Sequence, residues 1–170
     1  KYSGQNIIVS AAGNIDHEEL VKAVEKYLGS KQKRRFYQNR TRPKARVFRK
    51  VIEKPSEQLH VLLGLPCSSY KDRNRFEAFI VNALLGGGMT SKLYQSVREK
   101  RGLVYSIYST LNTFDDFGMI NIYSSCEPKN MRSVVKNISS ELKRVRKQGV
   151  TNSDLEMFKT QVNGSVLLGA

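Results

Sequence analysis

The spacing of apolar residues along the 170-residue chain alternates between the periods of strands and helices. An apolar run over 6–13 ends in glycine and predicts a short buried strand. An amphipathic helix is expected next, with Asp16 and Glu19 at its start and Gly29 at its end. Residues 30–45 lack apolar periodicity and predict a linker.

Apolar and charged residues alternate after this linker, and the alternation predicts strands at 48–52 and 59–65. Asp72 is the expected N-cap of a helix whose apolar face runs from Phe76 to Leu84. Three consecutive glycines end that helix.

The second half of the chain predicts another short helix, a hairpin and two longer helices. The expected elements are a helix from Thr90 or Ser91, strands at 104–111 and 117–125, a helix from Pro128 to Gly149, and a last helix opened by the capping-box pattern of Thr151 and Asp154. Hairpins and paired helices without regular βαβ alternation predict an α+β fold. We expect a two-layer α/β sandwich, with a mostly antiparallel sheet and helices packed on one face.

Composition narrows the class of protein without identifying it. Hydrophobic residues make up 39% of the chain and charged residues 26%, which is typical of a globular protein. No apolar run approaches the roughly 20 residues of a membrane helix, and no signal peptide is visible, so we expect no membrane partner. Cys67 and Cys126 lie far apart and in no metal-binding spacing, which favours buried or half-buried thiols and a cytoplasmic location.

The net charge of +14 is unevenly distributed. The segment 31–54 contains eleven Lys and Arg residues and only one acidic residue, Glu53. This segment is either a contact for a polyanion or a solvated linker. No nucleic-acid-binding motif accompanies it, so we favour the linker and do not expect a nucleic-acid partner.

Glycines 86–88 before a helix start allow two interpretations. Backbone N–H groups of glycine-rich turns bind phosphates, but a P-loop requires Gly-Lys-Ser/Thr, and here Lys92 follows Ser91. A helix rather than a strand is also expected before the glycines. We therefore favour a tight turn between two helices over phosphate binding.

One stretch is specific enough to indicate a family. Residues 86–106 read Gly-Gly-Gly-Met-Thr-Ser-Lys-Leu-Tyr-Gln-Ser-Val-Arg-Glu-Lys-Arg-Gly-Leu-Val-Tyr-Ser. This stretch resembles the signature of the second half of inverzincin peptidases, the insulinase, pitrilysin and mitochondrial processing peptidase family. Residues 6–17, 58–64 and 149–159 resemble other segments of the same family in the same order.

The resemblance implies a two-domain clamshell that encloses an extended peptide. Residues 1–29 would be the terminal strand and helix of a preceding zinc-carrying domain, 30–45 a basic linker, and 46–170 an incomplete metal-free domain. The family's zinc ligands lie in the other half, on a His-x-x-Glu-His helix that this chain lacks. The two histidines, His17 and His60, are expected to be an exposed helix residue and a strand residue with one local hydrogen bond. We therefore expect zinc in the complete enzyme and no metal bound by this chain.

The resemblance also assigns candidate site residues. Arg98 and Tyr105 match the Arg and Tyr that the family's metal-free half presents to substrate. Tyr105 would donate a hydrogen bond to the oxyanion formed at the attacked carbonyl, and Arg98 would bind peptide carbonyls. Gly86, Gly87, Gly88 and Ser91 would line the substrate chamber. Without the resemblance, Tyr105 would be read as a strand aromatic and Arg98 as an exposed helix end.

The implied function is the C-terminal portion of a zinc metalloendopeptidase, inactive in isolation. Its expected partners are a peptide substrate and a zinc-carrying N-terminal half, on the same protein or a partner subunit, with a homodimer as a further option. Two alternatives stay open: a noncatalytic interaction subunit of the same family, and a basic polyanion-binding module centred on residues 31–54.

Overall fold

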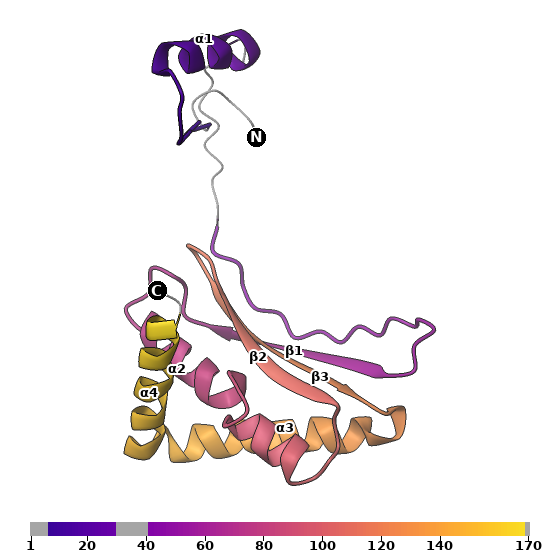
Figure 1. The fold of residues 1–170 in the computed structure, drawn as a ribbon. Coiled ribbons are helices and arrows are strands. Elements are labelled where there is room, and N and C mark those ends of the chain that lie inside the picture. Colours follow the sequence, from indigo (N-terminus) through magenta and orange to yellow (C-terminus); the bar gives the residue numbers. More distant parts are fainter. Residues whose placement is uncertain (1–6, 30–40, 169–170) are drawn as a thin grey trace. The chain divides into compact units, whose positions relative to one another are not determined.

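A computed structural model of the chain describes residues 7–29 and 41–168 (Figure 1). The chain divides into two units, Lys1–Thr41 and Arg42–Ala170.

The first unit contains helix α1 (His17–Leu28), as its sequence predicts. Asp16 caps it, because its Oδ1 accepts a hydrogen bond from the Glu19 N–H at 2.9 Å. The strand predicted over 6–13 is wrong for its described part, since residues 7–13 form no strand and Ile8 is 94% exposed. A strand needs a hydrogen-bonded neighbour, and no described residue of this unit pairs with the run.

The second unit contains a three-stranded antiparallel sheet in the order β1-β3-β2. The strands are β1 (Leu59–Cys67), β2 (Ser106–Thr113) and β3 (Gly118–Cys126). β2 and β3 form the predicted hairpin, closed by a 2.8 Å hydrogen bond from the Phe114 N–H to the Phe117 carbonyl. The strand predicted at 48–52 is wrong, because this segment pairs with no described strand and Phe48 is 82% exposed.

Four helical segments accompany the sheet. They are α2 (Arg75–Gly86), the π-helical η2 (Tyr94–Glu99), α3 (Met131–Gln148) and α4 (Asn152–Leu168), and a 3₁₀ turn, η3 (Pro128–Asn130), leads into α3. No helix in the described ranges has the length and apolar character needed to cross a bilayer.

Asp72 does not cap α2, which corrects the sequence-based prediction. The helix starts after Asn74, and the Asp72 carboxylate instead accepts the Ser69 N–H at 2.6 Å in the preceding turn. That hydrogen bond lowers the pKa of Asp72.

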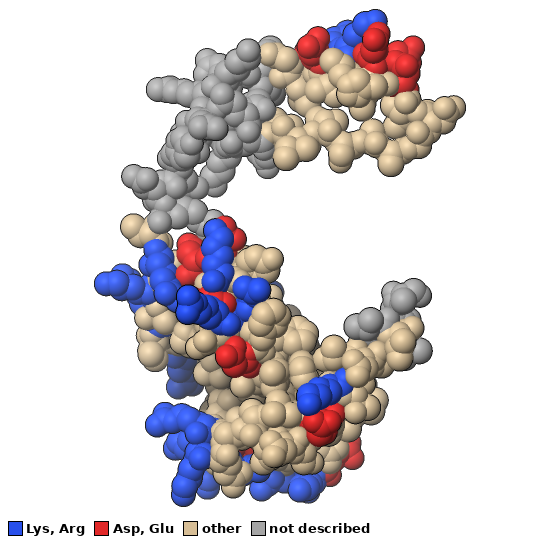
Figure 2. Space-filling view, turned by 90° about the vertical axis from the view of Figure 1, so that its left-hand side faces the viewer, with Lys and Arg blue, Asp and Glu red and all other residues tan. Residues whose placement is uncertain are grey.

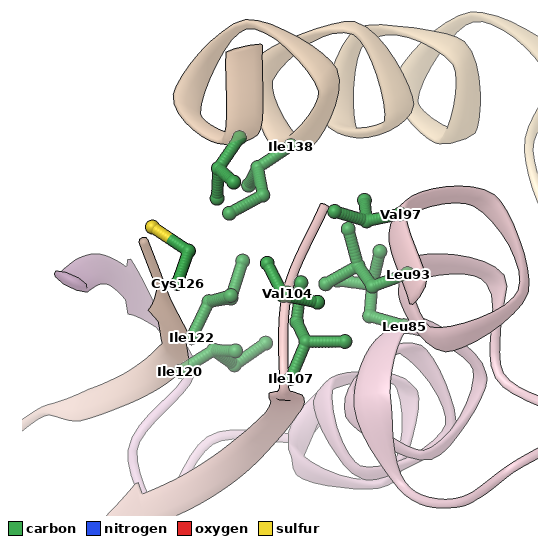
Figure 3. Close-up of a cluster of buried hydrophobic side chains, with 10 residues drawn as sticks. Leu85, Leu93, Val97, Val104, Ile107, Ile120, Ile122, Cys126 and Ile138 are labelled. Carbon is green, nitrogen blue, oxygen red and sulfur yellow. The ribbon is translucent and has the colours of Figure 1, made fainter. Parts of the chain in front are cut away.

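The sheet and helices form two layers, with α2, η2 and α3 on one face of the sheet (Figure 1). Alternate residues of β2 and β3 point into the core, where they meet apolar residues of the helices (Figure 3). The buried cluster consists of Leu85, Leu93, Val97, Val104, Ile107, Ile120, Ile122, Cys126, Val134 and Ile138. The predicted α+β sandwich with helices on one face is therefore confirmed.

Both cysteines are free thiols, as the sequence predicts. Cys126 is buried in the core cluster and Cys67 is half-buried. Burial raises the pKa of both thiols.

A largely buried ion pair connects the start of the η2 helix to the start of α4. Lys92 Nζ lies 2.7 Å from Asp154 Oδ1, and their side chains are 20% and 10% exposed. Asp154 also exchanges two hydrogen bonds with Thr151, which confirms the predicted capping box. The contact with Lys92 and the Thr151 N–H hold the pKa of Asp154 at about 2.

We expect Asp154→Asn to lower the free energy of unfolding by roughly 2 kcal/mol at neutral pH. The pKa of Asp154 is lower in the folded state than in the unfolded state. Its contribution to the free energy of unfolding is therefore fully present above the unfolded-state pKa near 4, and it is lost as the pH falls through about 2. Urea denaturation across this pH range measures the effect. Glu156→Gln is the matched control, since it breaks the exposed pair with Lys159 on the same helix. Equal losses in the two variants would contradict a special role for Asp154.

Candidate functional site

The glycine turn is built by close packing of α2 against β2. A Cβ atom at Gly86 would lie 2.3 Å from the Ser109 backbone nitrogen, so only glycine allows this approach. The Ser109 hydroxyl donates to the Asn82 carbonyl at 3.0 Å and fixes the same contact. A Cβ at Gly87 would meet the Ala83 Cα at 2.7 Å, whereas a Cβ at Gly88 would only reach the Gln161 side-chain nitrogen at an ordinary contact distance of 3.6 Å.

A cavity of about 350 Å³ lies at this turn. It is lined by Gly86, Gly87, Gly88, Met89, Tyr94, Ile107, Tyr108 and Ser109. Three of the predicted chamber residues, the glycines, therefore share one cavity. Ser91, the fourth, is buried and lies outside this lining, and its N–H donates to the Gly88 carbonyl at 3.1 Å.

Arg98 contacts the cavity wall through Tyr94. Its Nη1 donates to the Tyr94 hydroxyl at 2.7 Å, and its guanidinium carbon lies 4.8 Å from the centre of the Tyr94 ring. The two residues are four apart on the same helix, so their side chains share one face. Arg98 is thus half-buried against Tyr94 without being part of the cavity lining, and it is not an isolated helix-end charge.

Tyr105 lies beyond the turn that follows this helix. Gly102 adopts a φ of +58°, a conformation that favours glycine, and its N–H donates to the Arg98 carbonyl at 2.8 Å. The Tyr105 N–H donates to the Ser125 carbonyl at 2.8 Å, which anchors its backbone to β3. Its side chain is 73% exposed and is not in the cavity lining.

Sequence reasoning missed an aromatic row on the face of the sheet away from the helices. Tyr108 and Tyr123 have ring centres 4.9 Å apart, and the Tyr123 hydroxyl lies 2.8 Å from His60 Nδ1. The single local hydrogen bond expected for His60 is therefore present. The period-two pattern of the strands was the signal that could have placed these side chains on one face.

The described residues do not form a metal site. Across 7–29 and 41–168, no three His, Cys, Asp or Glu side chains come close enough to hold an ion. His17 is the exposed first residue of α1, as expected, and His60 contacts Tyr123. These residues do not fit the donor set of a zinc centre.

The sequence profile described as the peptidase M16 inactive domain matches residues 2–162. The chain belongs to the peptidase M16 inactive-domain family. This confirms the resemblance to insulinase-type peptidases seen in the sequence.

Relatives of this M16 domain bear zinc-protease names. An uncharacterized zinc protease of Streptomyces coelicolor is 36% identical over 99% of the chain, and one of Bacillus subtilis, YmxG, is 31% identical over 98%. The chain spans 38% and 41% of their lengths, respectively.

Solved structures agree with the fold. The peptidase M16 inactive domain from Pseudomonas fluorescens matches with a TM-score of 0.62 and 28% identity, over 65% of this chain and 27% of the other. A protease from Helicobacter pylori matches with a TM-score of 0.64 over 91% of this chain and 39% of the other. Its 16% identity supports the fold alone.

We expect Gly86→Ala to destabilise the domain by about 1–3 kcal/mol, because the added methyl group would overlap the Ser109 backbone. Gly88→Ala is the matched control in the same turn, and it should change stability by no more than about 0.5 kcal/mol. Urea denaturation compares the two variants. A Gly86→Ala protein as stable as Gly88→Ala would show that α2 does not need this close approach.

Proposed function

We propose that this M16 domain supplies the substrate-holding surface of a zinc metalloendopeptidase. The observation that carries the proposal is the contact of Arg98 with Tyr94, a residue of the cavity lining, followed seven residues later by the exposed Tyr105. The zinc-protease names of the relatives support the reaction class. Zinc, which polarises the peptide carbonyl and activates water when bound, would be held by a part of the whole protein outside this chain.

Tyr105 and Arg98 have different proposed roles. Within the described residues the Tyr105 side chain makes no hydrogen bond, so its hydroxyl is available to donate to an oxyanion at the attacked carbonyl. Arg98 uses Nη1 for Tyr94, which leaves its other N–H groups to bind carbonyls of the peptide backbone. The Tyr94 contact orients the guanidinium before substrate arrives.

The cavity suits an apolar side chain of the bound peptide. Its lining includes the apolar residues Met89, Tyr94 and Ile107 beside the three glycines, and none of its lining residues is charged. An apolar side chain placed there would lose water-exposed area while the peptide backbone stays near Arg98. Ser91 would support the turn from behind, not the substrate directly.

We also propose that the two units belong to different domains of the whole protein. Residues 1–29 would complete a preceding zinc-carrying domain, 30–45 would be the linker, and 46–170 would form the metal-free domain. The exposure of Ile8 and Val9 supports this division, because both would be covered by a sheet in that preceding domain. Residues 30–40 of the linker lie outside the described residues. The cytoplasmic location and the homodimer remain predictions from the sequence.

In the complete enzyme, Tyr105→Phe should lower kcat by roughly 100-fold to 1000-fold, the usual cost of losing an oxyanion donor. Zinc content and the melting temperature should stay unchanged, because the Tyr105 side chain is exposed and makes no described hydrogen bond. Tyr70→Phe is the matched control, since Tyr70 is also an exposed tyrosine but lies in the connection between β1 and α2 and not beside the Gly102 turn. An unchanged kcat in Tyr105→Phe would refute the assigned role.

The isolated chain should not hydrolyse peptides, with or without added zinc. A fluorogenic peptide assay with zinc and then with a chelator measures this directly. Zinc-dependent turnover by the purified chain would overturn the assignment of the metal to another part of the protein. The presence of His-x-x-Glu-His upstream of this segment in the whole protein would distinguish a peptidase from a noncatalytic interaction subunit.

A further inference from the structure

The solvent face of α3 carries a straight row of four basic residues. Arg132, Lys136, Lys143 and Lys147 are all exposed, and we call them the α3 basic row. Their spacing of four, seven and four residues places them within an arc of roughly 60° and along about 22 Å of the helix. The buried Val134 and Ile138 lie on the opposite side, against the core.

The acidic residues of α3 and of the turn before it pair with basic residues outside this row. The only acid in α3, Glu141, is buried and pairs with Arg144. Glu127, just before the helix, pairs with Lys129 at 2.6 Å. None of the four row residues forms an ion pair with any residue that the structure describes. Figure 2 shows Lys and Arg side chains gathered along the lower edge of the second unit, where α3 lies.

Helix stability does not explain the whole row, although the helix dipole favours Lys147 in the last turn. Arg132 and Lys136, like Lys143 and Lys147, are like charges at positions i and i+4, an arrangement that destabilises a helix. The apolar stripe of α3 already attaches it to the core, so packing does not require the charges. Binding to an anionic surface would give these unpaired charges a role that neither packing nor helix stability gives them.

We propose that the α3 basic row adsorbs the protein to an anionic lipid surface. The row is straight, runs along the exposed side of α3 and contributes no residue to the glycine-turn cavity. This arrangement suits a flat membrane surface better than a strand of nucleic acid. No aromatic residue occurs in α3 to stack on bases. Because the apolar side of α3 is committed to the core, adsorption would be electrostatic and without insertion. The sequence-based expectation of no membrane partner is revised for surface contact only.

The test compares two variants of the full chain with equal charge changes. The row variant carries Arg132→Gln, Lys136→Gln, Lys143→Gln and Lys147→Gln. The control variant carries Lys44→Gln, Arg46→Gln, Arg49→Gln and Lys50→Gln, which remove four exposed charges from another segment. Co-sedimentation is measured with phosphatidylcholine vesicles that contain about one third phosphatidylglycerol, and with phosphatidylcholine alone. Circular dichroism verifies that both variants fold.

The unmodified chain should bind the anionic vesicles and not the neutral ones. The row variant should lose about tenfold or more in partition coefficient, since each basic residue near such a surface contributes roughly fivefold, and the control should lose much less. Equal losses in both variants, or no binding by the unmodified chain, would overturn the proposal. It would also fail if the row variant lost binding to duplex DNA while keeping its binding to vesicles. The outcome is independent of peptidase activity.

Discussion

The close contact between the end of α2 and β2 is the constraint on which the proposed site depends. Gly86 has no side chain, and this lets the helix end lie directly on the Ser109 backbone. The contact forms the floor of the cavity and fixes where the chain leaves α2. The following helix then carries Tyr94 to the cavity wall and holds Arg98 against Tyr94.

A second set of contacts holds that helix in place from the other side. The buried Lys92–Asp154 pair joins it to α4, while Leu93 and Val97 pack into the core. Gly102 then turns the chain toward β3. The Tyr105 backbone is hydrogen-bonded to β3, and the Tyr105 side chain is exposed. The groups that we propose to contact a peptide are thus held by contacts to the core and to β3. This arrangement suits a domain that orients substrate while the metal chemistry is supplied elsewhere.

Periodicity predicted the elements whose partners lie within the chain, such as α3, α4 and the β2–β3 hairpin. It failed at 6–13 and 48–52, because alternation records which face of a strand is apolar but not whether a neighbouring strand exists to pair with it. Asp72 was misplaced as a cap because a turn around Ser69 competes for the same carboxylate.

The candidate site was predicted only where a family motif marked it. Arg98, Tyr105 and the chamber role of the three glycines all came from that resemblance. Tyr94 was missed, although its position four residues before Arg98 was a usable signal. The most direct measurement is a structure of the complete protein with an uncleaved peptide bound. The account predicts the Tyr105 hydroxyl about 2.7–2.8 Å from the scissile carbonyl oxygen and Arg98 on a neighbouring carbonyl. A peptide bound away from both residues would contradict it.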